Sequence, residues 1–185
     1  MRAILTTCFL AIISIPALAQ TANAPVPMLD LQRYSGQWHE IAHLPMFWQR
    51  QCRGDITATY TLQPGGTVGV RNACRTEDGS MDVSEGVARP VAGKPGALEV
   101  RFAPDWLSWL PWTWADYWVI DLDPDYRWAV VGSPSREYLW ILSRTPSMEQ
   151  TQFDRLKTKA EAKGYDLREL KVMTKLAGSS AASTN

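Results

Sequence analysis

Residues 55–75 read DITATYTLQPGGTVGVRNACR, and this stretch decides the fold class. Apolar and polar side chains alternate along 55–63, and one face carries Ile56, Ala58, Tyr60 and Leu62. A period of two is typical of a half-buried β-strand. Pro64-Gly65-Gly66 has the composition of a tight turn, and the alternation returns along 67–75. The stretch therefore predicts an antiparallel β-hairpin.

Six further candidate strands lie on either side of this hairpin, separated by short turn-forming segments. They are predicted at 39–44, 81–89, 97–102, 116–122, 128–132 and 138–143. Together with the hairpin they make eight short strands at regular spacing. Such spacing predicts an all-β sandwich or barrel.

One helix is predicted after the last of these strands. Pro146 suits a first helical position, and Ser147 and Gln150 fit a capping box. Gly164 fits a C-terminal cap. The helix has an apolar stripe, expected to pack against the outside of the barrel, of Phe153, Leu156 and Ala160. A short ninth strand is expected within 169–174.

The chain is expected to divide into four segments. Residues 1–19 resemble an export signal, with Arg2, an apolar run, and small residues at Ala17 and Ala19 before cleavage at Gln20. The other three segments are a flexible leader, a barrel with its helix, and a disordered tail, at 20–29, 30–175 and 176–185. Export predicts a periplasmic location, with association to the outer membrane as a further expectation.

Composition and cysteine content indicate what kind of protein this is. The length of 185 residues suits one domain, and 45% apolar residues are ordinary for a soluble protein. Nineteen basic side chains balance nineteen acidic ones, so charge does not favour nucleic acid. Cys8 lies ahead of most of the apolar run, where a lipoprotein processing site would not be placed. Export leaves Cys52 and Cys74, which the hairpin brings together and an oxidising compartment would pair.

Three separated motifs resemble the signatures of the lipocalin family. Gly36-Gln37-Trp38 resembles the G-x-W motif at the start of the first strand. Asp123-Pro124-Asp125-Tyr126 is similar to the second motif, T-D-x-x-Y, with Leu122 in place of the threonine. Arg144 resembles the lone arginine after the last barrel strand. The sequence around these motifs is most similar to that of the bacterial outer-membrane lipocalins and, more distantly, to that of the apolipoprotein D group.

The resemblance implies a fold and roles for the motif residues. It implies an eight-stranded antiparallel up-and-down β-barrel with one C-terminal helix packed outside. Trp38 would plug the closed end of the barrel, and Arg144 would lie across the indole, gaining a cation–π attraction of about 0.5–2 kcal/mol. The chain departs from its relatives in two ways: it shows no lipidated cysteine at the mature N-terminus, and His39 follows the tryptophan where tyrosine is common.

The inward faces of the predicted strands are apolar and aromatic, with space at Gly86 and Ala88. The residues expected to bind a ligand are Tyr60, Val70, Val100, Phe102, Tyr117 and Trp140. Alternation alone does not separate a ligand cavity from a core filled by side chains. The resemblance favours a lipid-like ligand, such as a fatty acid or a lysophospholipid. The alternatives are a structural or interaction module with a filled barrel and a haem-binding lipocalin.

A tryptophan-rich segment, residues 105–114, lies between two predicted strands, where the family has a loop at the open end of the barrel. Its tryptophans are Trp106, Trp109, Trp112 and Trp114. One interpretation is a lid packed over the opening. The other is peripheral contact with a membrane, because indole rings favour the lipid–water boundary.

No catalytic or metal-binding pattern emerges. His39 and His43 lie on one predicted strand with side chains about 13 Å apart, too far to share an ion, and are expected at the surface or the barrel opening. The acidic run Asp121 to Asp125 is typical of a turn that caps local amides. The sequence contains no nucleophile elbow, phosphate loop or zinc-protease motif. We therefore expect a binding protein without cofactor or metal.

Overall fold

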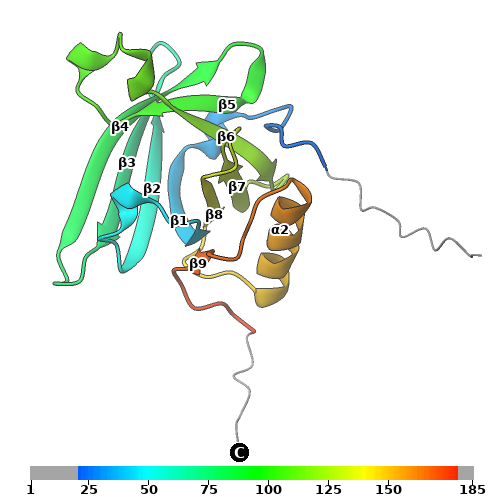
Figure 1. Cartoon of the computed structure of the whole chain (residues 1–185). Coiled ribbons are helices and arrows are strands. Elements are labelled where there is room, and N and C mark those ends of the chain that lie inside the picture. The colour runs from blue at the N-terminus through cyan, green and yellow to red at the C-terminus, as the bar shows by residue number, and fades with distance from the viewer. Residues whose placement is uncertain (1–20, 179–185) are drawn as a thin grey trace, which may run out of the picture.

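The computed structural model describes residues 21–178, so the expected export signal lies outside the described residues. Eight strands form a closed antiparallel barrel (Figure 1). They are β1 (Gly36–His43), β2 (Gly54–Leu62), β3 (Val68–Arg75), β4 (Met81–Val91), β5 (Lys94–Arg101), β6 (Ala115–Leu122), β7 (Trp128–Gly132) and β8 (Leu139–Ser143). Each strand pairs with the next, and β1 pairs with both β2 and β8. The predicted barrel is confirmed.

The hairpin that decides the fold class is β2 and β3, with Tyr60 paired to Val70 across the ladder. A disulfide joins Cys52 to Cys74, with their Cα atoms 5.5 Å apart. The two cysteines are 22 residues apart in the sequence, and the disulfide ties the entry of β2 to the end of β3. In the chain-entropy model, such a closure contributes about 3 kcal/mol to stability.

The motif residues seal one end of the barrel. Trp38 is fully buried, and its indole donates to the carbonyl oxygen of Tyr34. The Arg144 guanidinium lies 3.8 Å from the centre of the Trp38 ring. It also donates to the carbonyl oxygens of Arg33, Tyr34, Gln37 and Tyr126. Gly36 has φ +94°, and a Cβ there would lie 3.3 Å from Arg144, so glycine fits this position.

The second motif forms a turn at the same end. The buried Asp123 carboxylate accepts hydrogen bonds from the backbone N–H and the guanidinium of Arg127, which lower the pKa of Asp123. Tyr126 follows with φ +59°, and its hydroxyl accepts from the backbone N–H of Asp30. Asp30 in turn caps the short helix α1 (Leu31–Tyr34). The turn therefore ties the entry of β1 to the β6–β7 connection.

Helix α2 (Gln150–Ala162) packs outside the barrel beside the β7–β8 region (Figure 1). Its buried face is the predicted stripe of Phe153, Leu156 and Ala160, which covers outer-face residues of β1, β6, β7 and β8. Gly164 adopts φ +89° just after the helix, as the predicted C-terminal cap requires. Within residues 21–178, no helix combines the length and apolar character needed to cross a membrane.

The predicted start of this helix is wrong. The helix begins at Gln150, and neither Pro146 nor Ser147 is part of it. The preceding segment instead forms a parallel bridge between Glu149 and Ala177. The Gln150 N–H donates to the carbonyl oxygen of Ala177, so a segment distant in sequence satisfies the first helical donor.

The segments flanking the barrel make contacts that the sequence did not predict. Residues 21–29, expected as a flexible leader, form no helix or strand, but Val26 N–H donates to Val119 on β6. Val26 also lies so close to Gly96 that a Cβ there would be 2.5 Å from its carbonyl oxygen. The expected tail begins at 176, yet Ala177 pairs with the helix start. The ninth strand, β9 (Lys171–Val172), pairs with β1 and is shorter than expected.

Candidate ligand-binding site

A cavity of about 460 Å³ occupies the barrel interior. This volume lies within the range of about 300–1,000 Å³ that is common for small-molecule sites. Residues from three connections surround one end of the cavity, which we call the mouth: Trp48 from β1–β2, Thr113 from β5–β6 and Tyr138 from β7–β8. The sealed end with Trp38 lies opposite. The barrel is therefore hollow, which does not fit the filled-barrel alternative.

The six residues expected to bind a ligand all line this one cavity. Tyr60, Val70 and Tyr117 are buried. Phe102 is 43% exposed, which places it at the mouth of the cavity. The structure thus brings these residues together, as the alternation of the strands predicted.

Two residues expected to face the interior do not contribute space to it. Leu62 ends β2 with 39% of its surface exposed, because the strand runs out of the barrel there. Gly86 leaves no gap, since a Cβ there would meet the Phe102 ring at 2.8 Å and the Arg101 carbonyl oxygen at 2.5 Å. Ala88, in contrast, is buried and lines the cavity.

Three buried phenols form a chain next to the inner part of the cavity. The Tyr117 hydroxyl is 2.7 Å from the Tyr34 hydroxyl and 2.8 Å from the Tyr60 hydroxyl. Burial raises the pKa of Tyr60 to about 12, and it also raises the pKa of Tyr34 and of Tyr117. These phenols therefore remain neutral at physiological pH and supply a small polar patch in an apolar interior.

A buried carboxylate faces the cavity from β1, and the sequence analysis missed it. Glu40 is 8% exposed and lines the cavity. Gln49 Nε2 donates to both carboxylate oxygens, at 2.8 Å and 2.7 Å. The signal was available, because Glu40 lies two residues after the inward Trp38 on the same strand.

His43 corrects the expectation that both histidines lie at the surface or the opening. It is 4% exposed, and its Nδ1 lies 2.5 Å from Glu40 Oε1. A register shift in the β1–β8 pairing between Glu40 and Ala42 breaks the strict alternation that the prediction assumed. Neither His39 nor His43 is among the residues that line the cavity, so the haem alternative gains no support.

Aromatic rings gather at the mouth. The ring centres of Trp48 and Tyr138 are 4.9 Å apart, and those of Tyr138 and Trp140 are 6.2 Å apart. Trp140 Nε1 donates to Gln49 Oε1 at 3.4 Å. Trp48 and Gln49 belong to the short 3₁₀ helix η1 (Phe47–Gln49) in the β1–β2 connection. The sequence gives no periodic signal there, so these contacts were not predicted.

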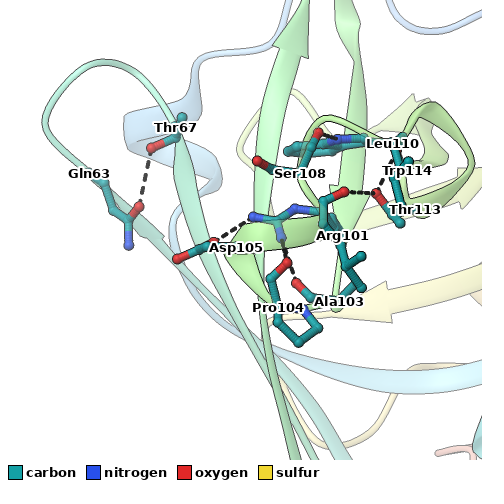
Figure 2. Close-up of polar contacts among 11 residues, drawn as sticks. Gln63, Thr67, Arg101, Ala103, Pro104, Asp105, Ser108, Leu110, Thr113 and Trp114 are labelled. Atoms are coloured by element: carbon teal, nitrogen blue, oxygen red, sulfur yellow. Dashed lines mark hydrogen bonds and ion pairs between the residues drawn. The ribbon is translucent and has the colours of Figure 1, made fainter.

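The base of the tryptophan-rich segment is held by polar contacts (Figure 2). Buried Arg101 donates to the carbonyl oxygens of Ala103 and Pro104 and forms an ion pair with Asp105. Trp114 Nε1 donates to the carbonyl oxygen of Ser108, and the Arg89 guanidinium lies 3.9 Å from a Trp114 ring centre. These contacts give the segment a defined shape.

The same contacts leave the other three tryptophans outside. Trp106, Trp109 and Trp112 are 74%, 76% and 77% exposed. They lie in or between the 3₁₀ helices η2 (Asp105–Leu107) and η3 (Pro111–Thr113). None of the three lines the cavity. In this structure they do not cover the opening as the lid interpretation requires.

Comparisons with known proteins agree with this architecture. The model of the Lipocalin-like domain family matches residues 29–175. The chain is 43% identical over 145 residues to temperature-induced lipocalin-1 of Arabidopsis thaliana, an alignment that covers 77% of each chain. It is 37% identical over 141 residues to the outer membrane lipoprotein Blc of Escherichia coli K12, covering 75% of each.

A solved structure is similar at the level of the fold. Insecticyanin from the tobacco hornworm Manduca sexta superposes with a TM-score of 0.63, covering 85% of this chain and 86% of that one. The two sequences are 20% identical, so this likeness concerns the fold alone. Together with the closed barrel, its sealed end and the family match, these relatives show that the chain belongs to the lipocalin family.

Proposed function

We propose that the protein binds a lipid-like ligand with a single hydrocarbon chain, a fatty acid or a lysophospholipid, and stores or transports it in the bacterial cell envelope. The observation that carries this proposal is the hollow barrel, whose inner part is lined by Val70, Ala88, Leu98 and Leu142. Burying each methylene of a chain there contributes about 0.8 kcal/mol. A carrier role rather than catalysis fits a site built mostly from apolar side chains.

The envelope location rests on two observations. The first residues of the chain resemble an export signal, and disulfides form and persist in oxidising compartments. Relatives named as outer membrane lipoproteins in Escherichia coli and Vibrio cholerae agree with such a location.

Lipid binding can be tested directly. Native mass spectrometry after detergent-free purification should detect a bound lipid, and a fluorescent fatty acid should bind saturably at micromolar concentration. Ala88→Trp, which fills the cavity, should weaken binding about tenfold or more. Val87→Trp, one residue along β4 and outside the cavity lining, is the matched control. An empty cavity that also refuses the fluorescent lipid would disprove the proposal.

We also propose that the mouth contacts a membrane through Trp106, Trp109 and Trp112. Their large exposed indoles are the side chains that favour the lipid–water boundary. Phe47 and Trp48 in the β1–β2 connection are 71% and 55% exposed, so apolar surface is present on two connections at this end. Contact at the mouth would let a lipid pass between bilayer and cavity without crossing bulk water.

Vesicle binding separates this docking role from a lid. The double variant Trp109→Ser, Trp112→Ser should bind neutral phosphatidylcholine vesicles more weakly, measured by co-flotation. Leu62→Ser removes an exposed apolar side chain on β2, outside the cavity lining, and serves as the control. Unchanged vesicle binding combined with altered ligand affinity would favour the lid instead.

A further inference from the structure

The charge lining the cavity is of one sign. Its charged lining residues are Glu40, Asp82 and Asp116. Among the described residues that line it, none is a lysine, an arginine or a histidine. A free fatty acid would bring a further carboxylate into this space without a cationic partner. Since an unpaired buried charge is costly, the cavity disfavours an anionic head group.

Glu40 is the most constrained of these carboxylates. Its side chain is 6% exposed, and Gln49 donates to both of its oxygens. His43 Nδ1 contacts Oε1 from outside the cavity lining, and this contact is an ion pair only when the imidazole is protonated.

Aromatic rings are linked to this carboxylate through the Gln49 side chain. Gln49, which holds Glu40, also accepts a hydrogen bond from Trp140. Trp140 neighbours Tyr138, and Tyr138 neighbours Trp48, and all three rings line the cavity. Aromatic faces attract quaternary ammonium groups through their electron-rich surfaces, and the attraction is larger where water is excluded. A carboxylate in the same cavity lining adds charge complementarity to such a cation.

We infer that the mouth of the cavity is a binding site for a cationic head group, an ammonium or trimethylammonium, between Glu40 and the rings of Trp48, Tyr138 and Trp140. This inference rests on the proposed lipid-binding function and narrows its ligand class. The hydrocarbon chain occupies the apolar interior, and the cation lies at the mouth. A zwitterionic lysophospholipid or a long-chain amine fits this arrangement better than a free fatty acid does.

Three probes with the same decyl chain test the charge preference: decyltrimethylammonium, decanoate and decanol, each displacing a neutral fluorescent lipid below its micellar concentration. The wild-type protein should bind the cation about tenfold more tightly than the carboxylate. Glu40→Gln should remove this preference, so that the ratio of cation to carboxylate affinity falls to about one. Glu85→Gln, which removes an exposed carboxylate outside the cavity lining, should keep the preference.

A second variant guards against misfolding of the buried substitution. Trp48→Leu changes a side chain that is 55% exposed, and it should weaken the binding of decyltrimethylammonium about fivefold more than the binding of decanol. Equal binding of cation and carboxylate by the wild-type protein would overturn the cation site while leaving lipid binding intact. Failure of decanol itself to bind would overturn the proposed function as well.

One further ligand identifies the source of the head group. If lysophosphatidylcholine binds as tightly as decyltrimethylammonium, the site is assigned to a phospholipid head group. If decyltrimethylammonium binds and lysophosphatidylcholine does not, the site is assigned to a long-chain amine. Both outcomes support a cation site. If neither ligand binds, the cation site is overturned.

Discussion

At the residue scale, the Arg144 guanidinium combines a cation–π contact with Trp38 and hydrogen bonds to carbonyl oxygens from several segments. Arg144→Lys keeps the charge but loses the planar fork, so most of these bonds cannot form. We expect a loss of about 2–4 kcal/mol in the free energy of unfolding, measured with urea. Arg168→Lys, at an 87% exposed side chain, should change it by less than about 0.5 kcal/mol. A similar small change for both variants would contradict the structural role of Arg144.

The phenol chain predicts a pH dependence. The folded-state pKa of Tyr60 is about 12, above the unfolded value of 10.0, and those of Tyr34 and Tyr117 are raised too. The stability from these neutral phenols is fully present below pH 10 and is lost as pH rises through the folded-state values. Ultraviolet titration should therefore show that these three tyrosines ionise only above pH 10, as the protein unfolds. Early reversible ionisation of all tyrosines would contradict the buried chain.

The sequence predicted the residues of the site unevenly. Tyr60, Val70 and Val100 followed from alternation, because a strand with one buried face places every second side chain inward. Glu40 was missed because a charged residue in a barrel wall was not considered as an inward one. His43 was misplaced because the register shift in β1 interrupts the period of two.

At the scale of elements, Gly132 on β7 lets α2 and its following turn approach the barrel. A Cβ at Gly132 would lie 2.0 Å from the Tyr165 hydroxyl, which accepts from the Ser133 N–H. Gly132→Ala should cost about 1–3 kcal/mol, measured by thermal or urea unfolding. In Gly69→Ala the new Cβ would meet mainly the flexible end of the Gln63 side chain, so that variant should cost less.

The element boundaries show what local patterns capture. The eight strands and the helical stripe were predicted because each repeats a burial period over several residues. The helix start was not, because Pro146 and Ser147 satisfy local rules for a helix while Ala177 competes for the backbone from a distant segment. A pairing of that kind leaves no local trace in the sequence.

At the scale of the whole molecule, ligand binding and folding are linked. A lipid that binds only the folded barrel, present at a hundred times its Kd, adds about 2.7 kcal/mol to stability. For a protein of this size, the Tm should rise by about 5–10 °C, measured by scanning calorimetry. Ala88→Trp should show little rise with the same lipid, whereas Val87→Trp should behave as the wild type. A rise of equal size in both variants would place the lipid outside the barrel.

The sealed end has a kinetic consequence for the molecule. Because Trp38 and Arg144 block one end, a molecule in the barrel has a single route and must leave by reversing its entry. A second ligand cannot enter from the sealed end and push the bound one out, so exchange requires that the bound ligand dissociates first. The rate of release is then the dissociation rate of the bound ligand, and it does not depend on the concentration of competing ligand.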